Sequence, residues 1–411
     1  MPDIAHLDLT PPDDGSRSRI DVHHHFCAPE WLEWAEDQGL AHRKALPPWA
    51  RWDAATALDL MDRAGIATAV LKPMLPARYA TSAQLREATA ITLRAAAEVT
   101  DAHPGRFAFH APLFLDDPEV ARWALRRGLD ELGAVGVNVT ANYGGIYLGD
   151  PSYDPLFADL DERSAVVDTH PHNLPLPGGG GGPGPGSGAG AGPGGGAGPG
   201  AGTGGGPGTG TGPGSGTGPS TSPGPGMGPG PGMGPGPGAW PGAGPMAGTG
   251  PGGVAVPGIP NFLCDFLLDT TRAALNMIHK GTLDRFPNLS VILPHAGGFL
   301  PHIATRVQAF AGAFTPPVEP ARVRDHLLRF YYDTAGPMSP AGTLLAMASP
   351  ERILFGSDWP ACPAEMVTDV ALPALAGDPA LTSAQRRAIN RDNAVRLMPA
   401  LAASAPAPAR A

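Results

Sequence analysis

Short apolar segments alternate with amphipathic helical segments along this chain, and that alternation predicts a (β/α)8 barrel. Eight segments have the length and composition of strands, and each is followed by a helical segment. Histidine and aspartate residues stand at the ends of four of these strands, which is where such a barrel builds its active site. A long Gly/Pro-rich tract interrupts the alternation after the fifth strand.

The predicted strands are rich in Val, Ile, Ala and Phe and are too short for helices. In order they are residues 19–25, 66–73, 107–114, 135–140, 165–170, 290–295, 330–334 and 353–356. The predicted helices place apolar residues three or four positions apart. They are residues 54–64, 83–102, 118–132, 153–163, 270–286, 300–314, 340–348 and 383–398.

The Gly/Pro-rich tract divides the sequence without adding a second globular domain. Between Asp168 and Asp265 there is no Asp, Glu, Lys or Arg, and residues 177–258 are almost entirely Gly, Pro, Ala, Thr and Ser. Such a composition has too few apolar side chains to offset the entropy of ordering, so we expect a disordered insertion. Residues 19–176 and 259–400 then form one barrel, and residues 1–18 and 401–411 are expected to be disordered ends.

Composition excludes several classes of function. The net charge of −10 argues against a nucleic-acid partner, which would need a basic surface. No apolar run is long enough to cross a membrane, and residues 1–18 lack the apolar core of a secretory signal. Three cysteines at unrelated spacings indicate a reduced, cytoplasmic protein with neither disulfides nor a cysteine metal site.

The segment Asp21-Val-His23-His24-His25 predicts a metal centre. Side chains alternate along a strand, so Asp21, His23 and His25 are expected on one face and His24 on the other. Two imidazoles two residues apart on one face can share an ion, and His170 and Asp358 end two other strands of the barrel. Neutral imidazoles with one carboxylate suit one divalent ion, zinc first and manganese second.

Four segments resemble the amidohydrolase superfamily: "IDVHHHF", "VVDTHP", "DTTRAALNMIHKGTLDRFPNLSVILPHAGGFLPHIATR" and "RILFGSDWP". They are most similar to its branch of aminocarboxymuconate-semialdehyde, 6-methylsalicylate and γ-resorcylate decarboxylases. The resemblance implies that His23, His25, His170 and Asp358 are metal ligands. It also implies that His295 moves a proton or orients a metal-bound water. Strand 135–140 lacks the bridging lysine of binuclear members, so a single metal is expected.

The resemblance implies a carbon–carbon lyase that decarboxylates a hydroxybenzoate-like or muconate-type acid without oxidation. A metal can hold the carboxylate and a neighbouring oxygen while an acid protonates the adjacent carbon. His295 is that acid in one version of the mechanism and Asp358 in the other.

Substrate contacts are expected from Arg272, Arg306 and Trp359. Arg306 matches an arginine that reaches into a neighbouring subunit's site in the muconate-type enzymes, which implies a homodimer or a higher homo-oligomer. Arg272 is equally compatible with a surface ion pair, and Trp359 with simple packing.

Two departures from the family pattern affect the expected substrate and centre. Asp168 stands on the inward face of its strand where relatives carry an apolar or aromatic residue, and it is either a partner for a histidine or a perturbation of the metal site. An arginine that anchors the muconate substrate has no clear match, which favours a hydroxylated aromatic acid. The alternatives are a mononuclear lactone or ester hydrolase and a non-enzymatic scaffold on a decayed barrel.

Overall fold

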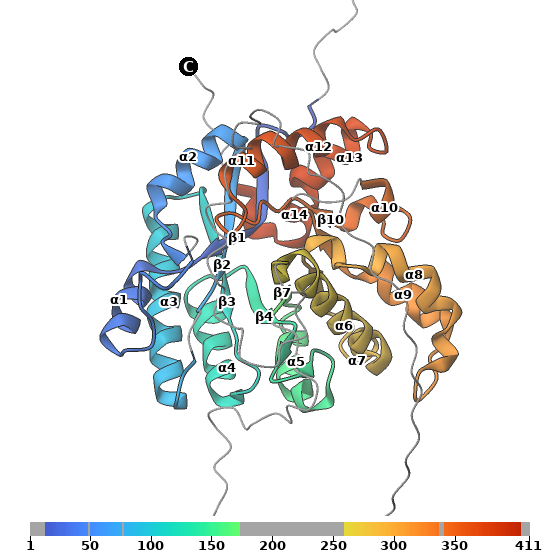
Figure 1. Cartoon of the computed structure of the whole chain (residues 1–411), viewed down its shortest axis with the longest axis horizontal. Coiled ribbons are helices and arrows are strands. Elements are labelled where there is room, and N and C mark those ends of the chain that lie inside the picture. Colours follow the sequence, from blue (N-terminus) through green and yellow to red (C-terminus); the bar gives the residue numbers. More distant parts are fainter. Residues whose placement is uncertain (1–12, 48–49, 76–77, 173–258, 337–340, 404–411) are drawn as a thin grey trace, which may run out of the picture. The chain divides into compact units, whose positions relative to one another are not determined.

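The computed structural model describes residues 13–47, 50–75, 78–172, 259–336 and 341–403. Within them eight strands form one sheet in the order β1-β2-β3-β4-β7-β8-β9-β10, and every adjacent pair is parallel (Figure 1). The strands are β1 (Arg19–Phe26), β2 (Ile66–Pro73), β3 (Phe107–Pro112), β4 (Gly136–Thr140), β7 (Val166–His170), β8 (Ser290–Leu293), β9 (Tyr331–Asp333) and β10 (Ile353–Leu354). A short hairpin, β5 (Asn142–Tyr143) and β6 (Ile146–Tyr147), follows β4.

Helices surround the strands (Figure 1). The α-helices are α1 (Pro29–Asp37), α2 (Ala54–Ala64), α3 (Ser82–Ala102), α4 (Pro118–Leu125), α5 (Asp154–Asp161), α6 (Asp265–Lys280), α7 (Thr282–Arg285), α8 (Leu300–Ala309), α9 (Pro320–Arg329), α10 (Ala341–Leu345), α11 (Ala364–Met366), α12 (Leu372–Gly377), α13 (Ser383–Arg387) and α14 (Asn393–Leu397). Single π-helical turns extend α4, join α11 to α12 and join α13 to α14. The predicted (β/α)8 barrel is confirmed.

Backbone hydrogen bonds between β1 and the segment after β10 close the barrel. Val22 N donates to Phe355 O, Asp358 N to His23 O and His25 N to Trp359 O, at 2.9, 2.9 and 2.7 Å. We call this junction the seam. It brings two histidines of the first strand beside an aspartate that lies more than 300 residues later in the chain.

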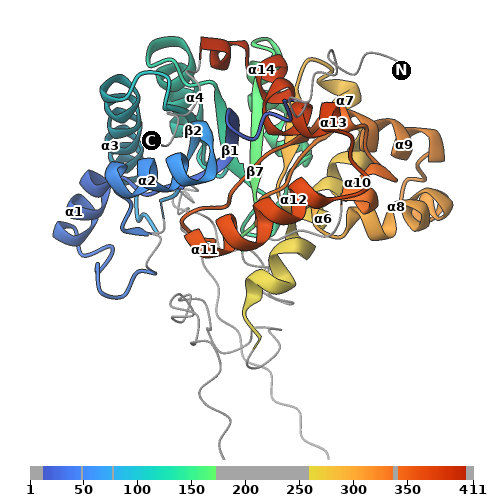
Figure 2. The same cartoon turned by 90° about the horizontal axis from the view of Figure 1, so that it is seen from above.

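Apolar side chains from seven strands fill the barrel interior towards the N-terminal ends of the strands. They are Ile20, Val22, Val70, Ala108, Val166, Ile292, Tyr331 and Leu354, and the side chains of Ala394, Met398 and Leu401 pack against them. Figure 2 shows α14 beside one end of the strands. The C-terminal segment therefore covers the barrel at the end opposite to the histidines.

A bulge in β1 overturns one expectation about its side chains. The register advances by three residues on β1, from Asp21 to His24, while β2 advances by two. The extra residue shifts the alternation, so the interior residues change from Ile20 and Val22 to His23 and His25. The expectation that Asp21 shares the face of His23 and His25 is therefore wrong. Its Oδ2 instead lies 3.2 Å from Nδ1 of His24.

Helices α1, α9, α11 and α12 and the β5–β6 hairpin lie in segments for which no element was predicted, and other differences concern the ends of elements. The sixth strand ends at Leu293, because Pro294 has no N–H to donate and His295 has a φ of 52°. Residues 13–18, assigned to a disordered end, are described, and Asn390 Nδ2 donates to Asp14 O at 2.8 Å. The Gly/Pro tract and the remaining ends, residues 1–12 and 404–411, lie outside the described residues.

Candidate metal centre

Three histidines and one aspartate converge where the barrel strands have their C-terminal ends. The Nε2 atoms of His23 and His25 lie 3.3 Å apart, and Asp358 Oδ1 lies 2.9 Å from His25 Nε2 and 3.3 Å from His23 Nε2. The His170 ring lies 4.9 Å from the His25 ring and 5.5 Å from the His23 ring, between centroids. Potential ligand atoms of the three histidines all lie within 4.8 Å of one another, so the structure brings the four predicted ligands together.

Hydrogen bonds on the outer nitrogens orient two of these rings. His23 Nδ1 lies 2.7 Å from Asp333 Oδ2, and His170 Nδ1 lies 2.8 Å from the carbonyl oxygen of Pro171. Both partners are acceptors, so each Nδ1 carries the proton and each Nε2 presents a lone pair. An acceptor behind a histidine is the usual arrangement around a metal, and the donor set therefore fits a divalent ion.

Burial and charge shift the pKa values of three of the candidate ligands. Burial lowers the pKa of His25 to about 4, although the hydrogen bond with Asp358 opposes the change. Burial also lowers the pKa of His170 well below its usual value. Burial alone would raise the pKa of Asp358, but the hydrogen bond with His25 and the nearby ring of His295 outweigh it and hold that pKa well below its usual range. These shifts favour the neutral imidazoles of His25 and His170 and the ionised carboxylate of Asp358.

His295 lies at the edge of this cluster. Its Nε2 is 3.7 Å from Asp358 Oδ2, and its ring lies 5.2 Å from that of His23. Its backbone N–H donates to Asp333 Oδ1 at 2.8 Å, which fixes the turn that carries it. Burial lowers the pKa of His295, but Asp358 outweighs that effect and the net pKa is raised.

Two residues that support His23 were not singled out from the sequence. Asp333 accepts from His23 and from the backbone of His295, so one carboxylate orients both. Lys72 is fully buried, with Nζ 3.2 Å from His23 Nδ1. The sequence could have indicated both residues, because each is a charged residue in an apolar strand, two positions after an inward-facing apolar residue.

Asp168, one of the departures noted above, does not contact a ligand histidine. Its Oδ2 lies 3.0 Å from Lys72 Nζ and 3.2 Å from His110 Nδ1. It is therefore a partner for a core histidine and for a buried lysine.

The side chains of the three predicted substrate residues make contacts with groups other than the four candidate ligands. Arg272 is exposed on α6 and lies near Tyr147 of the β5–β6 hairpin, where burial raises the pKa of Tyr147 to about 12 and Arg272 opposes that change. Arg306 is exposed on α8, with its guanidinium 5.2 Å from the ring centre of Phe310. The ring of Trp359 is buried 4.8 Å from the His24 ring. Phe266 on α6 lies beside a candidate ligand, with its ring 6.5 Å from that of His170.

The amidohydrolase family model matches residues 20–399. The chain belongs to this family. Among curated relatives, decarboxylase yanB of Aspergillus niger is 25% identical over 395 residues, 93% of this chain and 87% of the relative. The 6-methylsalicylic acid decarboxylase acuB of Aspergillus aculeatus is 26% identical, over 85% and 86% of the two chains. The γ-resorcylate decarboxylase of a Rhizobium species is also 26% identical, over 84% and 88%.

Solved structures share the fold of this family member. The 2,6-dihydroxybenzoate decarboxylase in complex with 2,6-dihydroxybenzoate superposes with a TM-score of 0.62 at 22% identity, covering 93% of this chain and 99% of that one. A dihydroxybenzoic acid decarboxylase from Polaromonas, with bound manganese and 2-nitroresorcinol, gives 0.62 at 21% identity over 93% and 97%. Among helices of the described residues, none combines the length and apolar composition that spanning a bilayer requires.

Proposed function

We propose that this amidohydrolase is a metal-dependent, non-oxidative decarboxylase of a hydroxybenzoate-like acid. The observation that carries the proposal is the cluster of His23, His25, His170 and Asp358 with His295 beside it. Relatives named as decarboxylases align over most of both chains, and two of their names specify hydroxylated aromatic acids. A muconate-type acid is the less favoured substrate, because the arginine that anchors it has no clear match.

The four ligands would hold one divalent ion, which supplies a Lewis acid that fixes a carboxylate and a neighbouring oxygen. Three imidazoles and one carboxylate suit zinc. Manganese is the second candidate, because a structure of similar fold contains it. Among the described residues of strand β4 no lysine is present to bridge a second ion, which supports a single metal.

The chain's own residues supply the proton transfer. His295 is placed to donate a proton to the ring carbon that bears the carboxylate, at the edge of the cluster rather than within it. The C–C bond to the carboxylate then breaks, its electron pair returns to the ring and CO2 leaves. His295 afterwards regains a proton from solvent. Asp358 is the less suited acid, because His25 and His295 both favour its ionised form.

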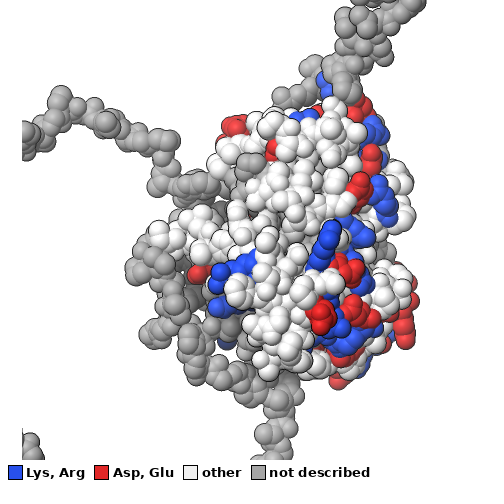
Figure 3. All heavy atoms as spheres, turned by 90° about the vertical axis from the view of Figure 1, so that its right-hand side faces the viewer, with Lys and Arg blue, Asp and Glu red and all other residues white. Residues whose placement is uncertain are grey.

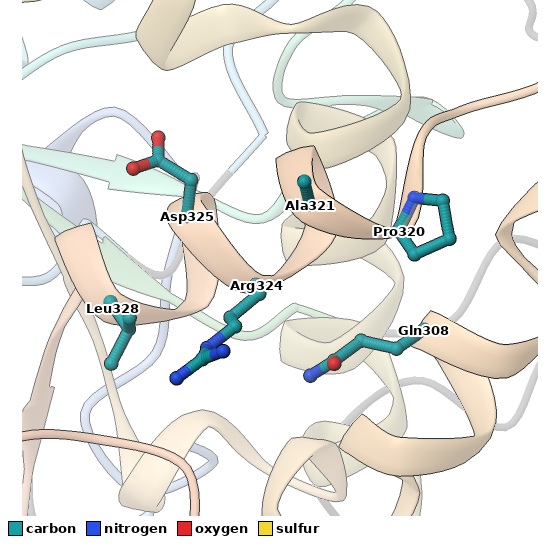
Figure 4. Close-up of a pocket in the computed structure, with 6 residues that line it drawn as sticks. All are labelled: Gln308, Pro320, Ala321, Arg324, Asp325 and Leu328. Carbon is teal, nitrogen blue, oxygen red and sulfur yellow. The ribbon is translucent and has the colours of Figure 1, made fainter.

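A homodimer fits the outer face of α8 and α9. Phe310 and Leu328 are 58% and 42% exposed there, and Arg306 stands beside Phe310. A hollow between the two helices is lined by Gln308, Pro320, Ala321, Arg324, Asp325 and Leu328, and Figure 4 shows Arg324 and Gln308 directed into it. In Figure 3 acidic and basic side chains are intermixed rather than segregated. Exposed apolar groups among charges of both signs suit a contact with a second copy.

Light scattering tests the dimer. The wild type is expected to have twice the mass of one chain, and Phe310→Glu to shift it towards a monomer because a charge replaces an apolar contact. A monomeric wild type at micromolar concentration would refute the assembly and, with it, the role of Arg306 across an interface.

The free state of Cys27, Cys264 and Cys362 fits the reducing cytoplasm, which is the proposed location.

Release of CO2 by the metal-replete protein tests the reaction. The panel contains ortho-hydroxybenzoates and carboxymuconates, with Asp358→Ala as the blank. Release that disappears in the blank supports decarboxylation. Silence across the panel with stoichiometric metal bound would overturn it in favour of lactone or ester hydrolysis, and silence without bound metal would favour a decayed barrel.

A further inference from the structure

A layer of charged and polar side chains lies directly above the apolar layer of the barrel interior. Lys72, His110, Asp168 and Asp333 each stand two positions beyond an interior apolar residue of the same strand, namely Val70, Ala108, Val166 and Tyr331. All four side chains are fully buried. A strand repeats its facing every two residues, so the four are inward-directed from β2, β3, β7 and β9.

These side chains form a continuous chain of contacts that ends at a metal ligand. Asp333 Oδ2 lies 2.7 Å from His23 Nδ1, and Lys72 Nζ lies 3.2 Å from the same nitrogen. Lys72 Nζ continues to Asp168 Oδ2 at 3.0 Å and to the carbonyl oxygen of Thr169 at 3.3 Å. Asp168 Oδ2 in turn lies 3.2 Å from His110 Nδ1.

The contact between Lys72 and His23 is one of position and charge. His23 Nδ1 already donates to Asp333, and an ammonium has no lone pair with which to accept. The cation therefore lies against the protonated edge of the ring, opposite the Nε2 that faces His25 and Asp358. Lys72 and Asp333 thus both contact the Nδ1 edge of the ring, and the Nε2 edge faces the other candidate ligands.

The charges of this layer, together with that of Asp358, also match one divalent ion. Three carboxylates, Asp168, Asp333 and Asp358, surround the centre, and Lys72 is the fully buried lysine among the described residues. The three carboxylates and the one ammonium together have a net charge of −2.

Stability alone does not account for a lysine and an aspartate in this layer. Replacing a buried ion pair by apolar side chains of similar volume is commonly neutral or stabilising, because desolvation offsets the attraction between the charges. An apolar pair would, however, leave the Nδ1 edge of His23 without the cation that Lys72 places there. The contact with the ligand is thus what the ion pair adds.

We propose that Lys72 is a positioning residue for the metal ligand His23, anchored in the barrel interior by Asp168. It holds the His23 ring from the Nδ1 edge together with Asp333, and so fixes the direction of the Nε2 lone pair. This inference rests on the metal centre proposed above. It adds a residue that contacts neither the ion nor the substrate.

The test removes both charges of the pair at once. Lys72→Met/Asp168→Asn keeps side-chain volume, leaves the net charge unchanged and retains an acceptor for His110. The expected result is a melting temperature close to that of the wild type and a dissociation constant for Co2+ about 10- to 100-fold higher, as for other partners of metal-bound histidines. We also expect a changed visible absorption band of bound Co2+, which reports ligand geometry independently of turnover.

The matched control is His110→Gln at the far end of the same chain of contacts. It should change the Co2+ dissociation constant far less than the double variant does, because the His110 ring contacts Asp168 and lies one contact further from the centre than Lys72. If the double variant binds Co2+ as the wild type does, with the same band, or binds it more tightly, Lys72 does not position His23.

Two further measurements keep the result decisive. Lys72→Gln retains a donor towards Asp168 without the charge, and a weaker, spectrally altered Co2+ complex in this variant supports the proposal even where the double variant does not fold. An unaltered complex in Lys72→Gln overturns it. A wild type that binds no Co2+ would instead remove the metal centre itself, which is a different failure.

Discussion

His295 differs in its position from the candidate ligand histidines, which is why a separate role is proposed for it. It lies 3.7 Å from Asp358, whereas the ligand atoms of His23, His25 and Asp358 lie within 3.3 Å of one another. His295→Gln should therefore retain one metal per chain and lose about 10²- to 10⁴-fold in kcat, the usual contribution of a general acid. Metal analysis and CO2 release check this, with the exposed His302→Gln as the control. Retained activity would instead indicate that Asp358 is the acid that donates the proton.

Asp269 is a buried residue of α6 that links this helix to the segment after β7 and to the β5–β6 hairpin. Its carboxylate accepts from His172 N at 2.7 Å and from Asn142 Nδ2 at 2.9 Å. Burial raises the pKa of Asp269 from 3.8 to about 6 in spite of these bonds. The folded chain therefore binds more protons than the unfolded chain between these values, and the free energy of unfolding should fall as pH rises through this range.

Asp269→Asn should flatten that pH dependence. The raised pKa implies a loss of about 2 to 3 kcal/mol in the wild type between pH 4 and pH 6.5. Denaturant unfolding at several pH values measures it, with the exposed Asp101→Asn of α3 as the control. An equal slope in the Asp269 variant and the wild type would show that this carboxylate is not the group responsible.

Among the elements, the seam depends most on one small residue. A Cβ added at Gly356 would lie 2.8 Å from the Cβ of His23 and 3.3 Å from that of Ala335. Gly356→Ala should destabilise the chain by about 1 to 3 kcal/mol, the usual cost of overpacking, and weaken metal binding because His23 must move. Gly377→Ala, where the added Cβ meets nothing within 4 Å, is the matched control. Equal melting temperatures and metal affinities for the two variants would contradict this account of the seam.

Element order was predictable because strands and helices differ in period and length. The helix 54–64 and the strand 66–73 agree with α2 and β2 to the residue. Asp53 caps α2 by accepting from Thr56 N, and Gly65 ends the helix with a φ of 66°. Both ends of α2 are therefore determined by residues adjacent in the sequence. Helix α9 was missed, although Pro320 begins it and apolar residues recur along it. Its place between two barrel elements breaks the simple alternation that guided the prediction.

The candidate site was predictable only as far as strand ends reveal it. His23, His25, His170 and Asp358 converge because parallel strands end at one rim. The bulge at Asp21 is set by pairing with β2 and with Ser357, whose N–H and hydroxyl both donate to Asp21, and none of this is local in sequence. Lys72 and Asp168 are 96 positions apart, so no local pattern could pair them.

At the scale of the whole molecule, the centre and its support come from two stretches of sequence on either side of the Gly/Pro tract. His23, Lys72 and His170 precede the tract, whereas His295, Asp333 and Asp358 follow it. The interior apolar cluster likewise combines residues from both stretches. The described residues therefore contain a complete barrel and a complete candidate site.

Replacing residues 177–258 by a 20-residue Gly/Ser linker should preserve that barrel. Such a linker has a root-mean-square span of about 25 Å, and shortening a loop changes its closure entropy only slowly. We expect a melting temperature within about 5 °C of the wild type, equivalent to about 1 to 2 kcal/mol, and unchanged metal stoichiometry. Calorimetry and metal analysis measure both. Loss of metal with an intact fold would make the tract part of the centre, and an unfolded product would make it part of the domain.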